Sequence, residues 1–81
     1  MATLPPDPNV LAATGGYLVA DARGRVLGRV ERASVEHGRL TVRGGFPLRR
    51  RHVVPAAAID EIDTTSGVIA LRVVRDDLRA L

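Results

Sequence analysis

Apolar and polar residues alternate in short runs along residues 17–74, and glycine-containing turns separate the runs. This spacing predicts β-strands, because successive side chains of a strand point to opposite faces. Leu40 and Val42 share one face, as do Ile69 and Leu71, and these faces are expected to form the core. The expected strands are Tyr17–Ala20, Val26–Val35, Leu40–Arg43, Leu48–Val54, Ile59–Asp63 and Val68–Val74.

Short strands joined by tight turns predict an all-β fold, and a small six-stranded antiparallel barrel in particular, because closure removes exposed edges. Gly24 is expected to take a positive φ in the turn Asp21–Arg25. Gly28 interrupts the second strand and predicts a bulge or sharp bend of the kind a barrel corner needs. Pro55–Ala58 is expected to form one helical turn, and Arg75–Leu81 a short C-terminal helix.

The chain of 81 residues is short enough for one domain. Residues 1–14 contain three of the five prolines and are predicted to form a flexible N-terminal arm, with the domain over residues 15–81. The alternative is that Val10–Ala13 forms a turn that packs against the domain.

One segment carries a resemblance to a known family, the PRC-barrel domains. Their first hairpin resembles the pattern Gly16-x-x-Val19-x-Asp21-x-x-Gly24-x-x-x-Gly28-x-Val30, and their later strands resemble Val53-Val54-Pro55 with Ile59, Ile62 and Ile69-x-Leu71. The resemblance covers residues 15–81. It implies a barrel that docks protein or ribonucleoprotein partners without catalysis, as in the cytoplasmic domain of the reaction-centre H subunit and the C-terminal domain of the ribosome maturation factor. We expect a stand-alone member that shares neither specific role.

All twelve basic residues are arginines, and nine acidic residues leave a net charge of +3. Such a modest charge fits a compositional bias better than nucleic-acid binding. The chain has no cysteine, which excludes disulfides and thiolate metal sites. It contains no recognisable targeting signal and no apolar run near the ~20 residues that span a bilayer. We therefore expect a soluble cytoplasmic protein without membrane insertion.

The strongest candidate for partner binding is the arginine cluster Arg49, Arg50 and Arg51, with Arg43 across the Gly44–Pro47 loop. Plausible strand registers place Arg43 on the same face as Arg49 and Arg51. Facing like charges cost stability, and a nearby anion or an acidic partner would offset that cost.

Three interpretations of this cluster remain open. The first is that its charge is neutralised within the molecule, by Asp60, Glu61 and Asp63, or is simply solvated. The second is that an acidic protein partner binds the cluster. The third is that RNA or a ribonucleoprotein binds it. Nucleic acid is least favoured, because Tyr17 and Phe46 are the only aromatic residues and base stacking needs more.

The remaining chemistry-bearing residues predict no catalytic or metal site. His37 lies in a turn, and His52 follows three arginines that disfavour cation binding. Ser34 and Ser66 have no nucleophile motif around them. We therefore expect neither an enzyme nor a cofactor.

Several apolar residues are difficult to place on the inner face of a single barrel, because their neighbours already occupy it. These residues are Val35, Phe46, Val53 and Val74. A cluster of apolar residues outside the core favours a homodimer, since a two-fold contact is the commonest cover for such a patch.

Overall fold

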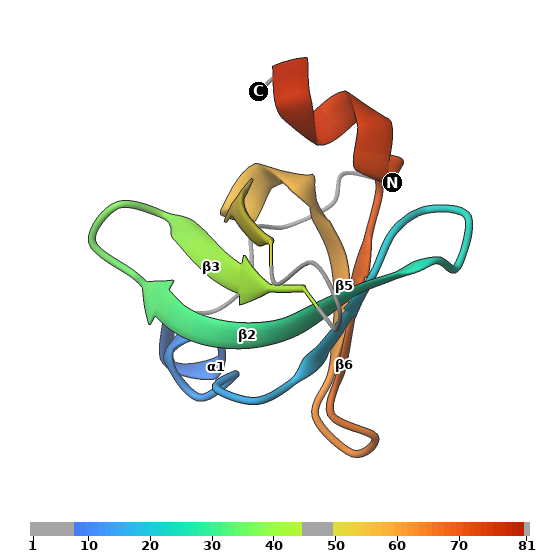
Figure 1. Ribbon diagram of the computed structural model, residues 1–81. Helices are drawn as coiled ribbons and strands as arrows, with labels where there is room; N and C mark the ends of the chain where they lie inside the picture. Colours follow the sequence, from blue (N-terminus) through green and yellow to red (C-terminus); the bar gives the residue numbers. More distant parts are fainter. Residues whose placement is uncertain (1–7, 45–49, 81) are drawn as a thin grey trace, which may run out of the picture.

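A computed structural model describes residues 8–44 and 50–80. Most of its regular structure is β, which confirms the all-β prediction, and β2 is a long strand that curves across the molecule (Figure 1). The elements are α1 (Pro8–Ala12), β1 (Leu18–Ala20), β2 (Val26–Ser34), β3 (Arg39–Arg43), β4 (Arg51–Pro55), the 3-10 helix η1 (Ala56–Ala58), β5 (Ile59–Asp63), β6 (Val68–Leu71) and the 3-10 helix η2 (Arg75–Ala80).

The strands form one six-stranded sheet in the order β4-β3-β2-β1-β6-β5. The antiparallel prediction is wrong for one pair, because β1 and β6 run parallel, with Leu18 opposite Val68. The sheet is therefore mixed. No ladder joins β4 to β5 among the described residues, so the sheet is not closed.

The helical turn η1 connects the two edge strands, β4 and β5, and forms backbone hydrogen bonds next to β3 and next to β6. At its start, the N–H of Ala56 donates to the carbonyl of Gly38, which precedes β3 (2.7 Å). At its end, the carbonyl of Ala58 accepts from the N–H of Arg72, which follows β6 (2.9 Å). This bond continues the Ile59–Leu71 register by one pair, and β6 ends at Leu71, before the predicted Val74.

Two register irregularities bend β2. The pairs Val19–Gly28 and Ala20–Val26 leave one extra residue, Leu27, in β2, so the irregularity predicted at Gly28 is confirmed. Gly28 has a φ of 151°, and a Cβ added there would lie 2.6 Å from the carbonyl carbon of Arg43. This close crossing of β2 and β3 requires glycine.

The second irregularity leaves Glu31 as an extra residue in β2, because Val30 pairs with Val42 and the next pair is Arg32 with Thr41. Because the bulge adds one residue to the alternation, residues three positions apart across it point to the same face of the sheet. Arg29 and Arg32 consequently lie on one face of the sheet.

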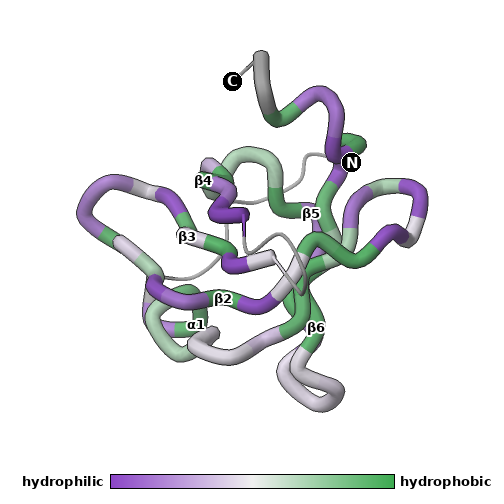
Figure 2. Tube along the Cα trace, in the orientation of Figure 1, coloured by the Kyte–Doolittle hydropathy of each residue, from purple (hydrophilic) through white to green (hydrophobic). Residues whose placement is uncertain are grey.

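Short branched side chains fill the core, and the predicted core residues of β3 and β6 are confirmed. Leu40, Val42 and Ile69 are completely buried, and Leu71 is nearly so. The buried apolar set is Leu11, Val19, Leu27, Val30, Leu40, Val42, Val54, Ala58, Ile59, Ile69, Leu71 and Leu78. Figure 2 shows hydrophobic β6 and the hydrophilic stretches of β2, β3 and β4.

The structure describes only part of the predicted N-terminal arm, because residues 1–7 lie outside the described part of the chain. Residues 8–14 show the packed alternative. Leu11 of α1 belongs to the core, and Thr14 is buried with its hydroxyl donating to the Leu11 carbonyl (2.7 Å). Leu11 and Thr14 therefore connect this segment to the domain. In the described residues, no helix is long and apolar enough to cross a bilayer.

Asp21 ties the β1–β2 turn to the C-terminal helix. Its Oδ1 accepts from the N–H of Arg23 (2.9 Å) and of Arg25 (2.8 Å), and its Oδ2 accepts from the N–H of Arg75, the first residue of η2 (3.0 Å). Burial raises the pKa of the Asp21 carboxyl, but these N–H donors, with the charge of Arg25, outweigh burial and leave its pKa below the ordinary value. The buried carboxylate is thus fully satisfied.

Candidate binding surface

Three arginines stand in a row across three neighbouring strands. Arg29 of β2 lies directly opposite Arg43 of β3, and Arg43 lies directly opposite Arg51 of β4. Residues opposite each other in antiparallel strands point to the same face. All three are exposed, so the row lies on the outer surface of the sheet.

The hydrogen-bond pattern brings two of these side chains especially close. The N–H of Gly44 donates to the carbonyl of Arg50 (2.5 Å), immediately beyond the last residues of the two strands. Bonded and non-bonded pairs alternate along an antiparallel ladder, so the next pair, Arg43 and Arg51, is non-hydrogen-bonded. Side chains of such pairs lie closest to each other.

Two more rows complete this outer surface. Arg32, Thr41 and Val53 form the second row, and Ser34, Arg39 and Pro55 form the third. We call the five exposed arginines of these rows the arginine face: Arg29, Arg32, Arg39, Arg43 and Arg51.

One carboxylate lies among these arginines. Glu31, the extra residue of the β2 bulge, forms an ion pair with Arg51, whose Nε lies 3.0 Å from Oε2. The Arg51 side chain nevertheless keeps 63% of its surface exposed. Glu31, Arg32, Thr41 and Arg51 line an open hollow of about 320 Å³. One acidic residue for five arginines leaves the face strongly cationic.

Two of the four predicted binding residues, Arg43 and Arg51, are brought together as expected. Arg50 is exposed and precedes β4, and by alternation it points away from the arginine face. Arg49 lies outside the described residues. Glu31, rather than Asp60, Glu61 or Asp63, forms the ion pair with Arg51.

Sequence reasoning missed Arg29, Arg32 and Arg39. The signal for Arg39 was present, because Arg39, Thr41 and Arg43 alternate with the buried Leu40 and Val42. Arg29 and Arg32 could not be joined in this way, since strict alternation sends residues three apart to opposite faces.

The other candidate residues have structural partners. Ser34 Oγ lies 2.9 Å from Nδ1 of His37 and also accepts from the His37 backbone N–H (3.3 Å), which closes the β2–β3 turn. Asp63 Oδ1 accepts from the N–H groups of Thr65 and Ser66 in the β5–β6 turn. The Ser66 hydroxyl and these N–H groups lower the pKa of Asp63. In these contacts Ser34, His37, Asp63 and Ser66 stabilise the β2–β3 and β5–β6 turns.

No model of a protein family matches this chain, and no curated protein matches it.

Proposed function

We propose that this protein is a non-catalytic binding module that docks an acidic protein partner on the arginine face. The observation that carries the proposal is the Arg29–Arg43–Arg51 row, with its central arginine facing a like charge on both sides. Like charges directly opposite each other destabilise a sheet. An arrangement that costs stability in the isolated chain is useful when an anion occupies the face.

The excess positive charge of this surface favours an acidic partner, because Glu31 supplies one negative charge for five arginines. Arginine also suits carboxylates, because its planar guanidinium offers paired N–H donors that match the two oxygens. Thr41 and Val53 lie between the charged rows and add a small uncharged contact area.

An acidic protein fits this surface better than RNA. Recognition of single-stranded RNA relies on aromatic side chains that stack on bases. Tyr17 is the aromatic residue within the described ranges, and it packs against the core rather than on the arginine face.

We also propose a specific fold, the PRC-type barrel, for this chain. A PRC-type barrel is supported by the six strands, by the glycine-dependent bend of β2 and by η1, which connects the two edge strands. We propose that this module acts in the cytoplasm.

Titration of the ¹⁵N-labelled chain with hexaglutamate tests the proposal. We expect amide shifts on β2, β3 and β4, and binding that weakens about threefold to fivefold in Arg43→Gln, the effect of one exposed ion pair. Arg23→Gln is the matched control, because it removes the same charge from the β1–β2 turn. Equal loss in both variants would show that hexaglutamate senses net charge alone and would contradict the proposal.

A parallel titration with hexauridine decides between the two anionic partners. Weaker binding of hexauridine than of hexaglutamate supports the protein partner. Tighter binding of hexauridine, with its shifts on the same three strands, would replace the proposal with the RNA alternative.

A further inference from the structure

The edge of β4 carries backbone groups that the sheet does not use. β4 is a terminal strand, and the carbonyl of Arg50 before it and the N–H of Ala56 after it both bond toward β3. Since bonding direction alternates along a strand, Arg51, Val53 and Pro55 direct their backbone groups away from β3. Proline lacks an N–H, and the Pro55 carbonyl accepts within the 3-10 helix η1, so among the described residues this edge offers two donors and two acceptors, at Arg51 and Val53.

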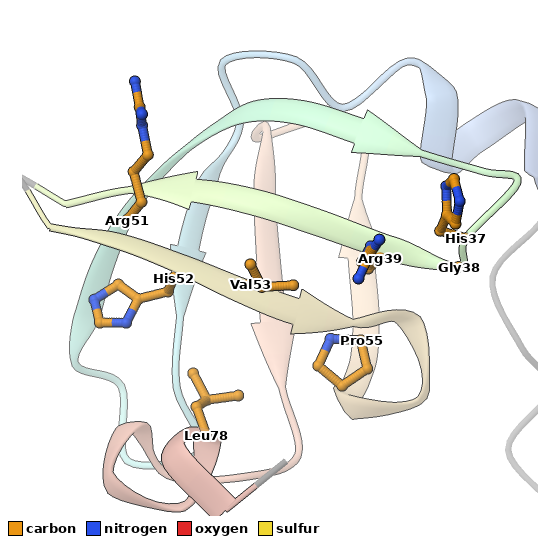
Figure 3. Close-up of a pocket in the computed structure, with 8 residues that line it drawn as sticks. All are labelled: His37, Gly38, Arg39, Arg51, His52, Val53, Pro55 and Leu78. Carbon is orange, nitrogen blue, oxygen red and sulfur yellow. The ribbon is translucent and has the colours of Figure 1, made fainter.

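A groove of about 490 Å³ runs along this edge. Arg51 and Val53 line it from the outer surface, while His52 and Leu78 line it from the other side of β4. Figure 3 shows Arg51 and His52 on opposite sides of β4, with Leu78 of η2 facing the strand. A groove lined by residues from both sides of one strand includes the edge of that strand.

From this geometry we infer that the partner binds by strand addition: an extended acidic segment of another protein pairs with the β4 edge. The inference rests on the proposed function and specifies how the arginine face is used. An added strand would continue each row of the outer surface by one residue, placing its outward side chains beside Arg51 and Val53. Its alternate side chains would lie beside His52 and Leu78.

Charge complementarity selects an acidic segment. Arg39 and Arg51 contribute positive charge to the groove, and none of the described residues that line it is acidic. The same charges oppose pairing of β4 with β4 of a second copy, because such pairing would bring two arginine faces together. The favoured segment therefore alternates carboxylates, facing the arginine face, with apolar residues.

Peptides with blocked backbone donors test the mode of binding. The parent probe is a six-residue peptide of alternating glutamate and valine, and two derivatives carry N-methyl groups on either the glutamates or the valines. In strand addition, alternate residues of the segment donate to β4, so one derivative binds about tenfold or more weakly and the other binds like the parent. Loss in the glutamate series indicates antiparallel addition, and loss in the valine series indicates parallel addition.

Hydrogen exchange of the full chain provides a second measurement. Binding of the parent peptide should slow exchange of the Arg51 and Val53 amides, which face away from β3, several-fold more than exchange of the Val54 amide. Equal affinity of both derivatives with unchanged exchange at Arg51 and Val53 overturns strand addition. If this peptide still loses affinity in Arg43→Gln and not in Arg23→Gln, the proposed function survives that result. Failure of both hexaglutamate and the alternating peptide to bind overturns both.

Discussion

The carboxylate of Asp21 accepts a hydrogen bond from the backbone N–H of Arg75, so a side chain in the first β-turn begins the C-terminal helix η2. The same carboxylate holds the β1–β2 turn through Arg23 and Arg25. One buried acid thus connects the beginning of the sheet to the last element of the described chain.

Asp21→Asn should destabilise the protein by about 1–3 kcal/mol, because the amide group of asparagine leaves a backbone N–H without an acceptor. The pKa of Asp21 is lowered in the folded state, so its contribution to stability is complete above the ordinary carboxyl pKa and is lost as the pH falls through the folded value. Melting temperatures measured at pH 7 and pH 3 should therefore differ less in this variant than in the natural chain. Asp60→Asn, which removes the same charge from an exposed position, should not reduce that difference as much.

Gly28→Ala should cost at least about 2 kcal/mol, since it adds backbone strain at positive φ to a collision with the Arg43 backbone. Gly24→Ala separates the two effects, because Gly24 also has a positive φ, of 81°, but nothing within 4 Å of an added Cβ. Urea unfolding of both variants checks the prediction. Equal destabilisation would show that the close crossing of β2 and β3 is unimportant.

Removal of the central arginine should stabilise the isolated chain. Arg43→Gln relieves the facing charges of Arg29 and Arg51 and is expected to gain about 0.2–1 kcal/mol at low salt. The gain should vanish near 1 M salt, where charges are screened within about 3 Å. Arg51→Gln is the comparison, because it also loses the ion pair with Glu31 and should gain less. Thermal unfolding at both salt concentrations measures the difference, and a loss of stability in Arg43→Gln would contradict it.

The homodimer remains a prediction. Val35 and Val53 are 41% and 54% exposed, Val74 is half-buried, and Phe46 lies outside the described residues. Light scattering across a concentration series should show a dimer mass that Val35→Ser lowers and that Val26→Ser, at another exposed valine, leaves unchanged. A monomer mass persisting at high micromolar concentration would contradict the dimer.

Local signals were sufficient to predict most of the elements. Turn glycines and alternation predicted β5 with its observed bounds and every other strand approximately. The parallel pairing of β1 with β6 joins residues far apart in the chain, and no local pattern encodes it. The arginine face could be predicted only in part for a similar reason. The bulge at Glu31 decides which face Arg32 occupies, and the local sequence pattern does not show that bulge.

The parallel pair also has a consequence for the order of events during synthesis. β1 leaves the ribosome early, yet one of its two neighbours, β6, is among the last elements made. The β2–β3 and β3–β4 hairpins can form while the chain grows, but the centre of the sheet stays incomplete until β6 arrives. Ribosome-bound chains that end before Val68 should consequently remain sensitive to protease, and protection should appear abruptly once residues 68–78 have emerged.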